Sequence, residues 1–183
     1  MQSERARVTR QLRNWGGTMA ALAVAAKAPE FDLGTLDGKR FSLNHELARA
    51  PVVLVFFKIS CPTCQYALPF FERLHQAYGR QGVTLVGISQ NDVKETAAFN
   101  KEFGITFPVL LDDAHSYPVS NAYGLTNVPT IFWIAQDGDI EVSSVGWLKG
   151  DFEQINRRMA AAGKITPSTV FQPGEDVRDF RAG

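Results

Sequence analysis

Two cysteines three positions apart, Cys61 and Cys64, are the residues of this sequence whose type and spacing could do chemistry. They enclose Pro62 and Thr63 and follow a continuous apolar run over 51–57. Such a run is typical of a buried strand, so we expect a strand, a short turn and a helix beginning at Cys61. Free N–H groups and the helix dipole favour an anion there. The pattern therefore predicts that Cys61 attacks as a thiolate and that Cys64, one turn later, resolves the mixed disulfide.

Three neighbouring residues are candidates for tuning this pair. Lys58 places a cation three residues before Cys61. Pro62 suits the first helical turn, where its missing N–H costs nothing. Together with Thr63 it forms the dipeptide that helps to set the redox potential. We therefore expect Lys58, Pro62 and Thr63 to influence the pKa of the attacking thiol.

The cysteines could instead be ordinary core residues or half of a metal site. A zinc site would need two further ligands. The histidines are His45, His75 and His115, and nothing in the sequence pairs them with Cys61 or Cys64. We therefore expect no metal and no cofactor.

A second candidate feature is a proline at the entrance to an apolar run over 130–135. Pro129 removes a backbone donor there, which is costly in a central strand. It could simply begin the strand. Alternatively, the Val128–Pro129 bond is cis and lies opposite the cysteines, which leaves the backbone of Val128 free to pair with a substrate chain. Val128 and Pro129 are therefore candidate substrate-binding residues.

Composition narrows the class of protein. The chain has 183 residues, 19 Lys+Arg and 19 Asp+Glu, so its formal net charge is zero. A nucleic-acid binder would need a basic face, which this balance does not favour. No run reaches the ~18 apolar residues of a membrane span. Two cysteines cannot form the disulfide framework of a small secreted protein. One ordinary domain of average composition is expected.

Strands and helices alternate along the middle of the chain. The expected strands are 51–57, 83–89, 107–111, 130–135 and 140–145, and the expected helices are 62–78, 93–103, 116–123 and 150–162. Pro108 favours an edge position for its strand, and Asp137-Gly138 predicts a tight hairpin turn. Parallel crossovers followed by a hairpin predict an α/β fold, a mixed sheet with helices on both faces.

The two ends differ from this pattern. We expect an N-terminal extension over 1–21, one domain over 22–162 and an extended tail over 163–183. The first 14 residues carry four arginines against one glutamate, and Ala26-Lys27-Ala28 is similar to a signal-peptidase site. The favoured interpretation is an extension of a cytoplasmic protein, and the alternative is a signal or anchor of a periplasmic one.

Several short motifs occur in a characteristic order. They are Ala28–Leu33, Asp37–Lys39, Phe56-Phe57 before Cys61–Cys64, Phe107–Asp112 and Val128–Thr130. In this order the chain resembles the redoxin branch of the thioredoxin-fold superfamily, the TlpA-like thiol–disulfide oxidoreductases and their peroxiredoxin-like (AhpC/TSA) relatives. The resemblance implies a thioredoxin-like three-layer sandwich with an added N-terminal hairpin over Phe31–Leu43 and an insertion within 92–112.

The same resemblance implies activity and partners. Cys61 and Cys64 would act on protein disulfides or dithiols and exchange electrons with an upstream dithiol reductant or oxidant. No nucleic-acid partner and no membrane span are expected, and the chain would be a monomer or weak dimer.

The chain also departs from its relatives. Val55 replaces the buried Asp of thioredoxin, and Ala67 replaces a Glu common in TlpA-like reductases. Peroxiredoxins carry a Thr three residues before the peroxidatic cysteine, a place that Cys61 takes relative to Cys64, and an Arg that Asn127 does not supply. A thiol peroxidase using Cys61 or Cys64 is therefore the second hypothesis. A non-catalytic thioredoxin-fold binding module is the third.

Overall fold

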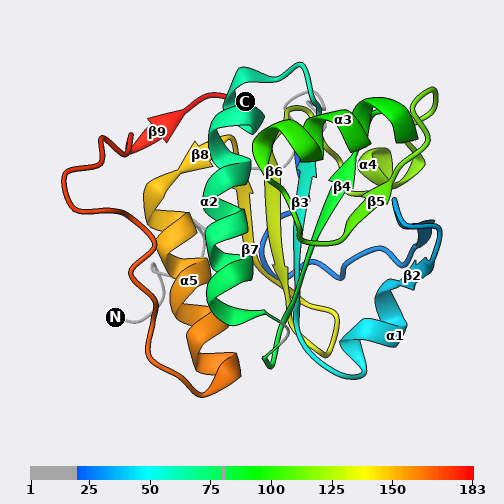
Figure 1. Ribbon diagram of the computed structural model, residues 1–183. Helices are drawn as coiled ribbons and strands as arrows, with labels where there is room; N and C mark the ends of the chain where they lie inside the picture. Colours follow the sequence, from blue (N-terminus) through cyan, green and yellow to red (C-terminus); the bar gives the residue numbers. More distant parts are fainter. Residues whose placement is uncertain (1–19, 80) are drawn as a thin grey trace, which may run out of the picture.

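A mixed five-stranded sheet forms the centre of the molecule (Figure 1). The computed structural model describes residues 20–79 and 81–183. In spatial order the strands are β5 (Val109–Leu111), β4 (Thr84–Ser89), β3 (Val52–Phe57), β6 (Thr130–Ile134) and β7 (Ile140–Val145). Strands β3, β4 and β5 are parallel, whereas β6 runs antiparallel to both β3 and β7. The predicted mixed sheet, with β5 at its edge, is confirmed.

The burial of each strand follows from its place in the sheet. Every residue of β3, β4 and β6 is buried, because helices or loops cover both faces of the sheet there. Strand β7 lies at the other edge, and its residues alternate between buried and more exposed positions. The continuous apolar runs of the sequence therefore mark the central strands.

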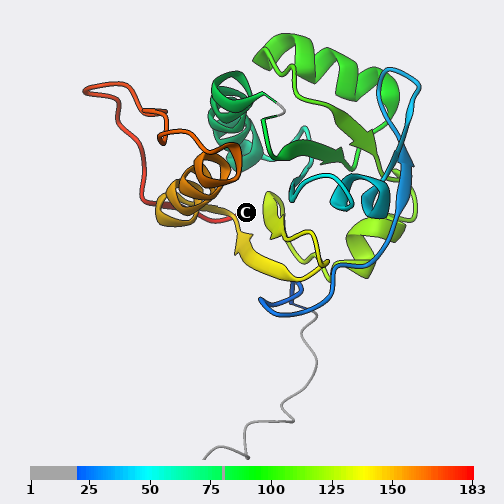
Figure 2. The same ribbon diagram turned by 90° about the horizontal axis from the view of Figure 1, so that it is seen from below.

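Two layers cover the sheet, as Figure 2 shows from below. One face packs against α2 (Pro62–Tyr78), α3 (Val93–Phe103) and α5 (Lys149–Gly163), which contribute residues such as Leu68, Phe99 and Phe152. The other face packs against α1 (Leu43–Leu47), α4 (Pro118–Ala122) and an N-terminal hairpin. The result is a three-layer sandwich.

The N-terminal hairpin consists of β1 (Asp32–Gly34) and β2 (Arg40–Ser42), within the range that the resemblance implies. Helix α1 follows directly and was not predicted. It has five residues and is capped by the Ser42 hydroxyl, which accepts from the His45 N–H. A helix this short contains too little apolar periodicity to be recognised in a sequence.

The beginning of the described chain lies along β7. The N–H groups of Ala25 and Ala28 donate to the carbonyl oxygens of Ile140 and Gly138, at 2.8 and 2.9 Å. Residues 1–19, with most of the expected extension and the arginine-rich segment, lie outside the described residues. Within the described ranges, none of the helices has the length and apolar character needed to cross a bilayer.

The tail expected over 163–183 begins one residue later, because Gly163 is the last residue of α5, and its far end is part of a sheet. Strand β9 (Phe180–Arg181) pairs antiparallel with β8 (Trp147–Leu148), and neither strand was predicted. Two-residue strands have no alternation that a sequence can reveal. Strand β9 lies beside the beginning of α2 (Figure 1).

Candidate active site

Helix α2 begins at the first cysteine. Cys61 is its N-cap, with extended backbone angles (φ −84°, ψ 115°), and its Sγ accepts the Cys64 N–H at 3.2 Å. Pro62 occupies the first turn, as expected. The Cys61 N–H donates to the Lys58 carbonyl oxygen at 3.1 Å, which closes the turn after β3. The sulfur therefore takes the position that a capping side-chain oxygen takes in other helices.

The two thiols have different environments. Both are free; Cys61 is half-buried, whereas Cys64 is fully buried at 0% exposure. Cys64 belongs to the core beneath α2. A partner disulfide can therefore meet the sulfur of Cys61 but not that of Cys64.

The pKa values of the two thiols move in opposite directions. A hydrogen bond with the Cys64 thiol makes the largest contribution to the pKa of Cys61, which falls to about 6 despite partial burial. The N–H groups of Cys64 and Thr63 and the charge of Arg181 lower it further. Burial, followed by the hydrogen bond with Cys61, raises the pKa of Cys64. Near neutral pH, Cys61 is therefore largely a thiolate and Cys64 a thiol.

The loop before β6 lies against Cys61. The Val128–Pro129 peptide bond is cis, as expected. In its protonated form, the Cys61 thiol donates to the Val128 carbonyl oxygen at 3.2 Å. The Thr130 hydroxyl donates to the Asn127 carbonyl oxygen at 2.7 Å and holds the loop in shape. The structure thus brings Cys61 and Val128 together.

The turn between β3 and α2 is held by two side chains that sequence reasoning missed. Asn91 accepts the Ile59 N–H on its Oδ1 at 3.0 Å. Gln65 donates from its Nε2 to the Ile59 carbonyl oxygen at 2.8 Å. Both hydrogen bonds hold the backbone of Ile59, two residues before Cys61. Neither Asn91 nor Gln65 belongs to a sequence motif that would have identified this role.

Of the three expected tuning residues, Thr63 has a further contact. Its hydroxyl donates to the Ala182 carbonyl oxygen at 2.6 Å, 119 positions along the chain. Arg181 is a cation that contributes to the low pKa of Cys61, and nothing in the structure tests the same role for Lys58. The role assigned to Lys58 therefore stays a prediction. Nothing in the sequence connected Arg181 or Ala182 with the cysteines, because a short polar segment gives no long-range signal.

No carboxylate occupies either of the two positions where relatives place one. Val55 and Ala67 are both fully buried, at 0% exposure, in the apolar core that also contains Cys64. Among the described residues, no group of three or more His, Cys, Asp or Glu side chains is arranged to hold a metal ion.

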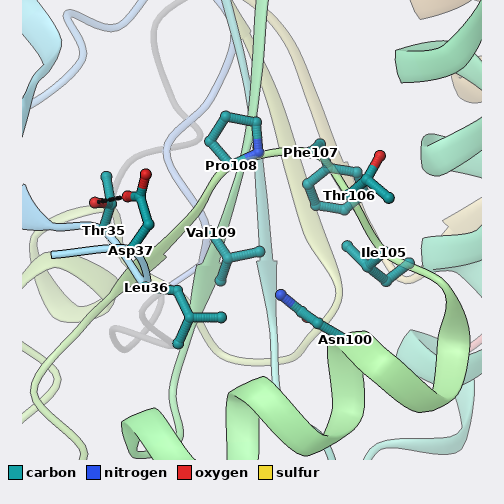
Figure 3. A pocket seen from close by; sticks show the side chains of 9 residues that line it. All are labelled: Thr35, Leu36, Asp37, Asn100, Ile105, Thr106, Phe107, Pro108 and Val109. Atoms are coloured by element: carbon teal, nitrogen blue, oxygen red, sulfur yellow. Dashed lines mark hydrogen bonds between the residues drawn. The ribbon is translucent and has the colours of Figure 1, made fainter. Parts of the chain in front are cut away.

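A cavity of about 490 Å³ lies elsewhere, between the β1–β2 turn and the end of α3 (Figure 3). Thr35, Leu36 and Asp37 form one side, and Asn100 with residues 105–109 forms the other. Neither cysteine lines this cavity, nor do Val128 and Pro129. It is therefore separate from the thiol site.

Comparison with known proteins adds independent findings. The model of the AhpC/TSA family matches residues 24–143. The thiol-disulfide oxidoreductase ResA of Geobacillus thermodenitrificans is 32% identical over 136 residues, which cover 73% of this chain and 76% of that protein. A putative peroxiredoxin of Mycobacterium tuberculosis, MT2597, is 30% identical over 128 residues, 64% of this chain and 81% of that protein. The solution structure of a putative protein disulfide isomerase from Bacteroides thetaiotaomicron is similar in fold, with a TM-score of 0.71, 22% identity and coverage of 78% and 91%.

Proposed function

Because the chain belongs to the AhpC/TSA family and is a thiol–disulfide oxidoreductase, we propose that Cys61 is its nucleophile and Cys64 its resolving thiol. The observation that carries this assignment is the contrast between the two sulfurs. Cys61 is accessible and has a pKa lowered to about 6, whereas Cys64 is fully buried one helical turn below. The substrates are proteins with disulfides or thiols.

In the first step, the Cys61 thiolate attacks one sulfur of a substrate disulfide. The substrate S–S bond breaks, a Cys61–substrate disulfide forms, and the other substrate sulfur leaves as a thiolate that takes a proton from water. The N–H groups of Cys64 and Thr63 stabilise the attacking anion before the reaction. The beginning of α2 thus supplies the thiolate at neutral pH.

In the second step, Cys64 attacks Cys61 and releases the substrate reduced. The hydrogen bond and the charge of Cys61 both raise the pKa of Cys64. Both effects end when Cys61 becomes part of a mixed disulfide, so Cys64 then loses its proton more readily. Because Val55 and Ala67 provide no carboxylate, water accepts the proton that Cys64 loses in this scheme. The cycle oxidises Cys61 and Cys64 to a disulfide, which an upstream dithiol reduces.

The loop before β6 supplies the substrate-binding edge in this proposal. The carbonyl oxygen of Val128 lies 3.2 Å from the Sγ of Cys61. A substrate strand that pairs with the Val128 backbone would bring its own disulfide to the sulfur. Pro129 directly precedes β6, so this edge of backbone lies at the entrance to that strand. The chain acts as a monomer or weak dimer in this scheme.

The place of action is the cytoplasm, with the periplasm as the alternative if residues 1–21 act as a signal or anchor. Cleavage after Ala28 is disfavoured by the contacts of residues 22–28. The N–H groups of Leu22, Ala25 and Ala28 all donate to the folded domain. Fractionation of cells that produce a tagged chain, with its N-terminus sequenced, distinguishes the two compartments.

A second candidate function is the reduction of hydroperoxides, because a putative peroxiredoxin is among the relatives. The Cys61 thiolate would attack one oxygen of the hydroperoxide and break the O–O bond. Cys61 would become a sulfenic acid, and the other oxygen would leave as the alcohol after taking a proton from water. Cys64 would then condense with the sulfenic acid to a disulfide and release water. The buried Cys64 is a poor candidate for the peroxide-reacting thiol.

The test compares two assays on the same protein. With dithiothreitol as reductant, we expect reduction of insulin disulfides well above the uncatalysed rate, and consumption of hydrogen peroxide near background. The Cys61→Ser variant should lose the insulin activity. Fast peroxide consumption with slow insulin reduction would establish the second candidate. Loss of both activities in a folded protein would establish a binding module.

A further inference from the structure

The end of the described chain returns to the thiol site. Strand β9 pairs with β8 in the register Trp147↔Arg181 and Leu148↔Phe180, and the Lys149 N–H donates to the Asp179 carbonyl oxygen at 3.0 Å. Figure 1 shows this segment beside the first turn of α2. We call residues 179–183 the C-terminal cover.

The C-terminal cover bridges two elements that lie beside Cys61. On one side, Thr63 of α2 donates from its hydroxyl to the Ala182 carbonyl oxygen at 2.6 Å. On the other, Asn127 donates from its Nδ2 to the Gly183 carbonyl oxygen at 3.1 Å. A substrate strand that pairs with the Val128 backbone would have to lie between these same two elements.

The backbone of the cover lies close to the Val128 loop. A Cβ added to Gly183 would lie 2.6 Å from the Val128 carbonyl oxygen. On the next loop, a Cβ added to Gly146 would lie 2.6 Å from the Arg181 carbonyl oxygen and 3.1 Å from the Gly183 nitrogen. The cover thus runs against the backbone of both loops, and a substrate strand would compete with it for the Val128 edge.

The cover is attached differently from the tail that precedes it. That tail is anchored by Arg73, which pairs with Glu175 at 2.7 Å, and by Trp147, whose Nε1 donates to the Arg178 carbonyl oxygen at 2.6 Å. In the cover, Asp179, Phe180, Ala182 and Gly183 are exposed, and only Arg181 is half-buried. Residues 182 and 183 lie beyond the β8–β9 pairing and beyond Arg181, whose guanidinium lies 4.7 Å from the Tyr66 ring, so they can leave the Val128 edge while the anchors stay in place.

We propose that the C-terminal cover determines which disulfides reach Cys61. Small disulfides react while it is in place, whereas a disulfide within a polypeptide reacts only after the cover has left the Val128 edge. This inference rests on the proposed function, since it needs Cys61 as the nucleophile and Val128 as the docking edge. The apparent rate with a protein substrate is then reduced by the fraction of molecules in which the cover is open.

The test compares the full chain with a variant that lacks residues 179–183. The pre-reduced proteins are mixed with oxidised glutathione or with insulin, and the loss of thiolate absorbance gives each rate. We expect the deletion to increase the insulin rate about fivefold or more and the glutathione rate less than about twofold. The ratio of the two rates is the readout, because loss of Arg181 also alters the Cys61 thiolate itself.

Two matched variants support this comparison. Arg181→Gln removes the charge and the contact with the Tyr66 ring but keeps the bonds of the cover to Thr63 and Asn127, so it should change the ratio of the two rates less than the deletion does. Asn127→Ala removes the side-chain bond to Gly183, so it should increase the insulin rate selectively, by less than the deletion does. This second variant keeps the proposal testable if the deletion impairs folding.

The outcomes separate the two proposals. If the full chain reacts with glutathione but neither the deletion nor Asn127→Ala raises the ratio of insulin rate to glutathione rate, the cover proposal is wrong and the proposed function stands. If the full chain reacts with neither disulfide, the assignment of Cys61 as nucleophile is itself wrong.

Discussion

The Sγ of Cys61 lies 3.2 Å from the carbonyl oxygen of Val128, although 67 positions separate the two residues. This contact joins the beginning of α2 to the loop before β6. The pairing of β3 with β6 brings the two together, because Phe56 near the end of β3 is opposite Thr130 at the beginning of β6. The central sheet therefore builds the site from two distant segments.

Alkylation of the reduced protein should label Cys61 alone under native conditions. Since its pKa is lowered to about 6, the labelling rate should rise as pH increases through 6 and level off above about 7. Peptide mass spectrometry after timed iodoacetamide treatment measures both sites. Labelling of Cys64 at an equal or greater rate would reverse the two roles.

Replacement of Cys64 by alanine should raise the pKa of Cys61 by about one unit, because the hydrogen bond with the Cys64 thiol makes the largest contribution to lowering it. Ultraviolet absorbance of the thiolate, followed against pH, measures the change. The Cys61→Ala variant serves as control and should show no titration near pH 6. An unchanged midpoint in Cys64→Ala would show that the backbone N–H groups and Arg181 stabilise the anion without the Cys64 thiol.

The Cys64→Ser variant should accumulate covalent complexes with substrate proteins. Without the second thiol, the mixed disulfide at Cys61 has no intramolecular attacker and persists. Non-reducing electrophoresis detects these complexes, and dithiothreitol should release them. The Cys61→Ser variant is the control and should trap nothing. The opposite pattern would make Cys64 the nucleophile and favour peroxidase chemistry.

Replacement of Arg181 by glutamine should raise the pKa of Cys61 by a few tenths of a unit, because its charge helps to stabilise the thiolate. The sequence predicts such a role for Lys58, so Lys58→Gln is the matched comparison. We expect the smaller rise in Lys58→Gln. The same absorbance titration measures the pKa of Cys61 in both variants. A larger rise in Lys58→Gln would show that Lys58, as predicted from the sequence, is the main cation that tunes this thiol.

Replacement of Tyr78 by phenylalanine should destabilise the fold by about 1–3 kcal/mol, the cost of leaving buried polar groups without partners. The Tyr78 hydroxyl donates to Asn156 and accepts the Ser168 N–H at 2.8 Å, in a site with 1% exposure. Urea unfolding measures the free energy.

Tyr117→Phe is the control for this prediction, because the Tyr117 hydroxyl forms no hydrogen bond with any part of the chain that the structure describes. This replacement should lower the free energy of unfolding by well under about 1 kcal/mol. Equal losses in the two variants would mean that the Tyr78 network does not support the fold.

Local sequence patterns determined most of the secondary structure around the site. Helix α2 was predicted at its observed bounds, since an apolar strand, a tight turn and Pro62 define where it begins. Helix α3 likewise begins after the Asp92 cap and ends at Gly104 in a left-handed conformation. These features depend on residues within a few positions of one another.

The sequence also determined the contrast between the two cysteines, because a spacing of three places one thiol at a helix end and the other a turn inside. The cis bond before Pro129 was predicted from the cost of placing a proline at the entrance to a central strand. Only the tertiary structure brought the C-terminal segment to the site. The contacts of Ala182 with Thr63 and of Gly183 with Asn127 span 119 and 56 positions of the chain. They involve backbone carbonyls of short, exposed residues, which have no apolar period, so their place depends on how the whole fold closes.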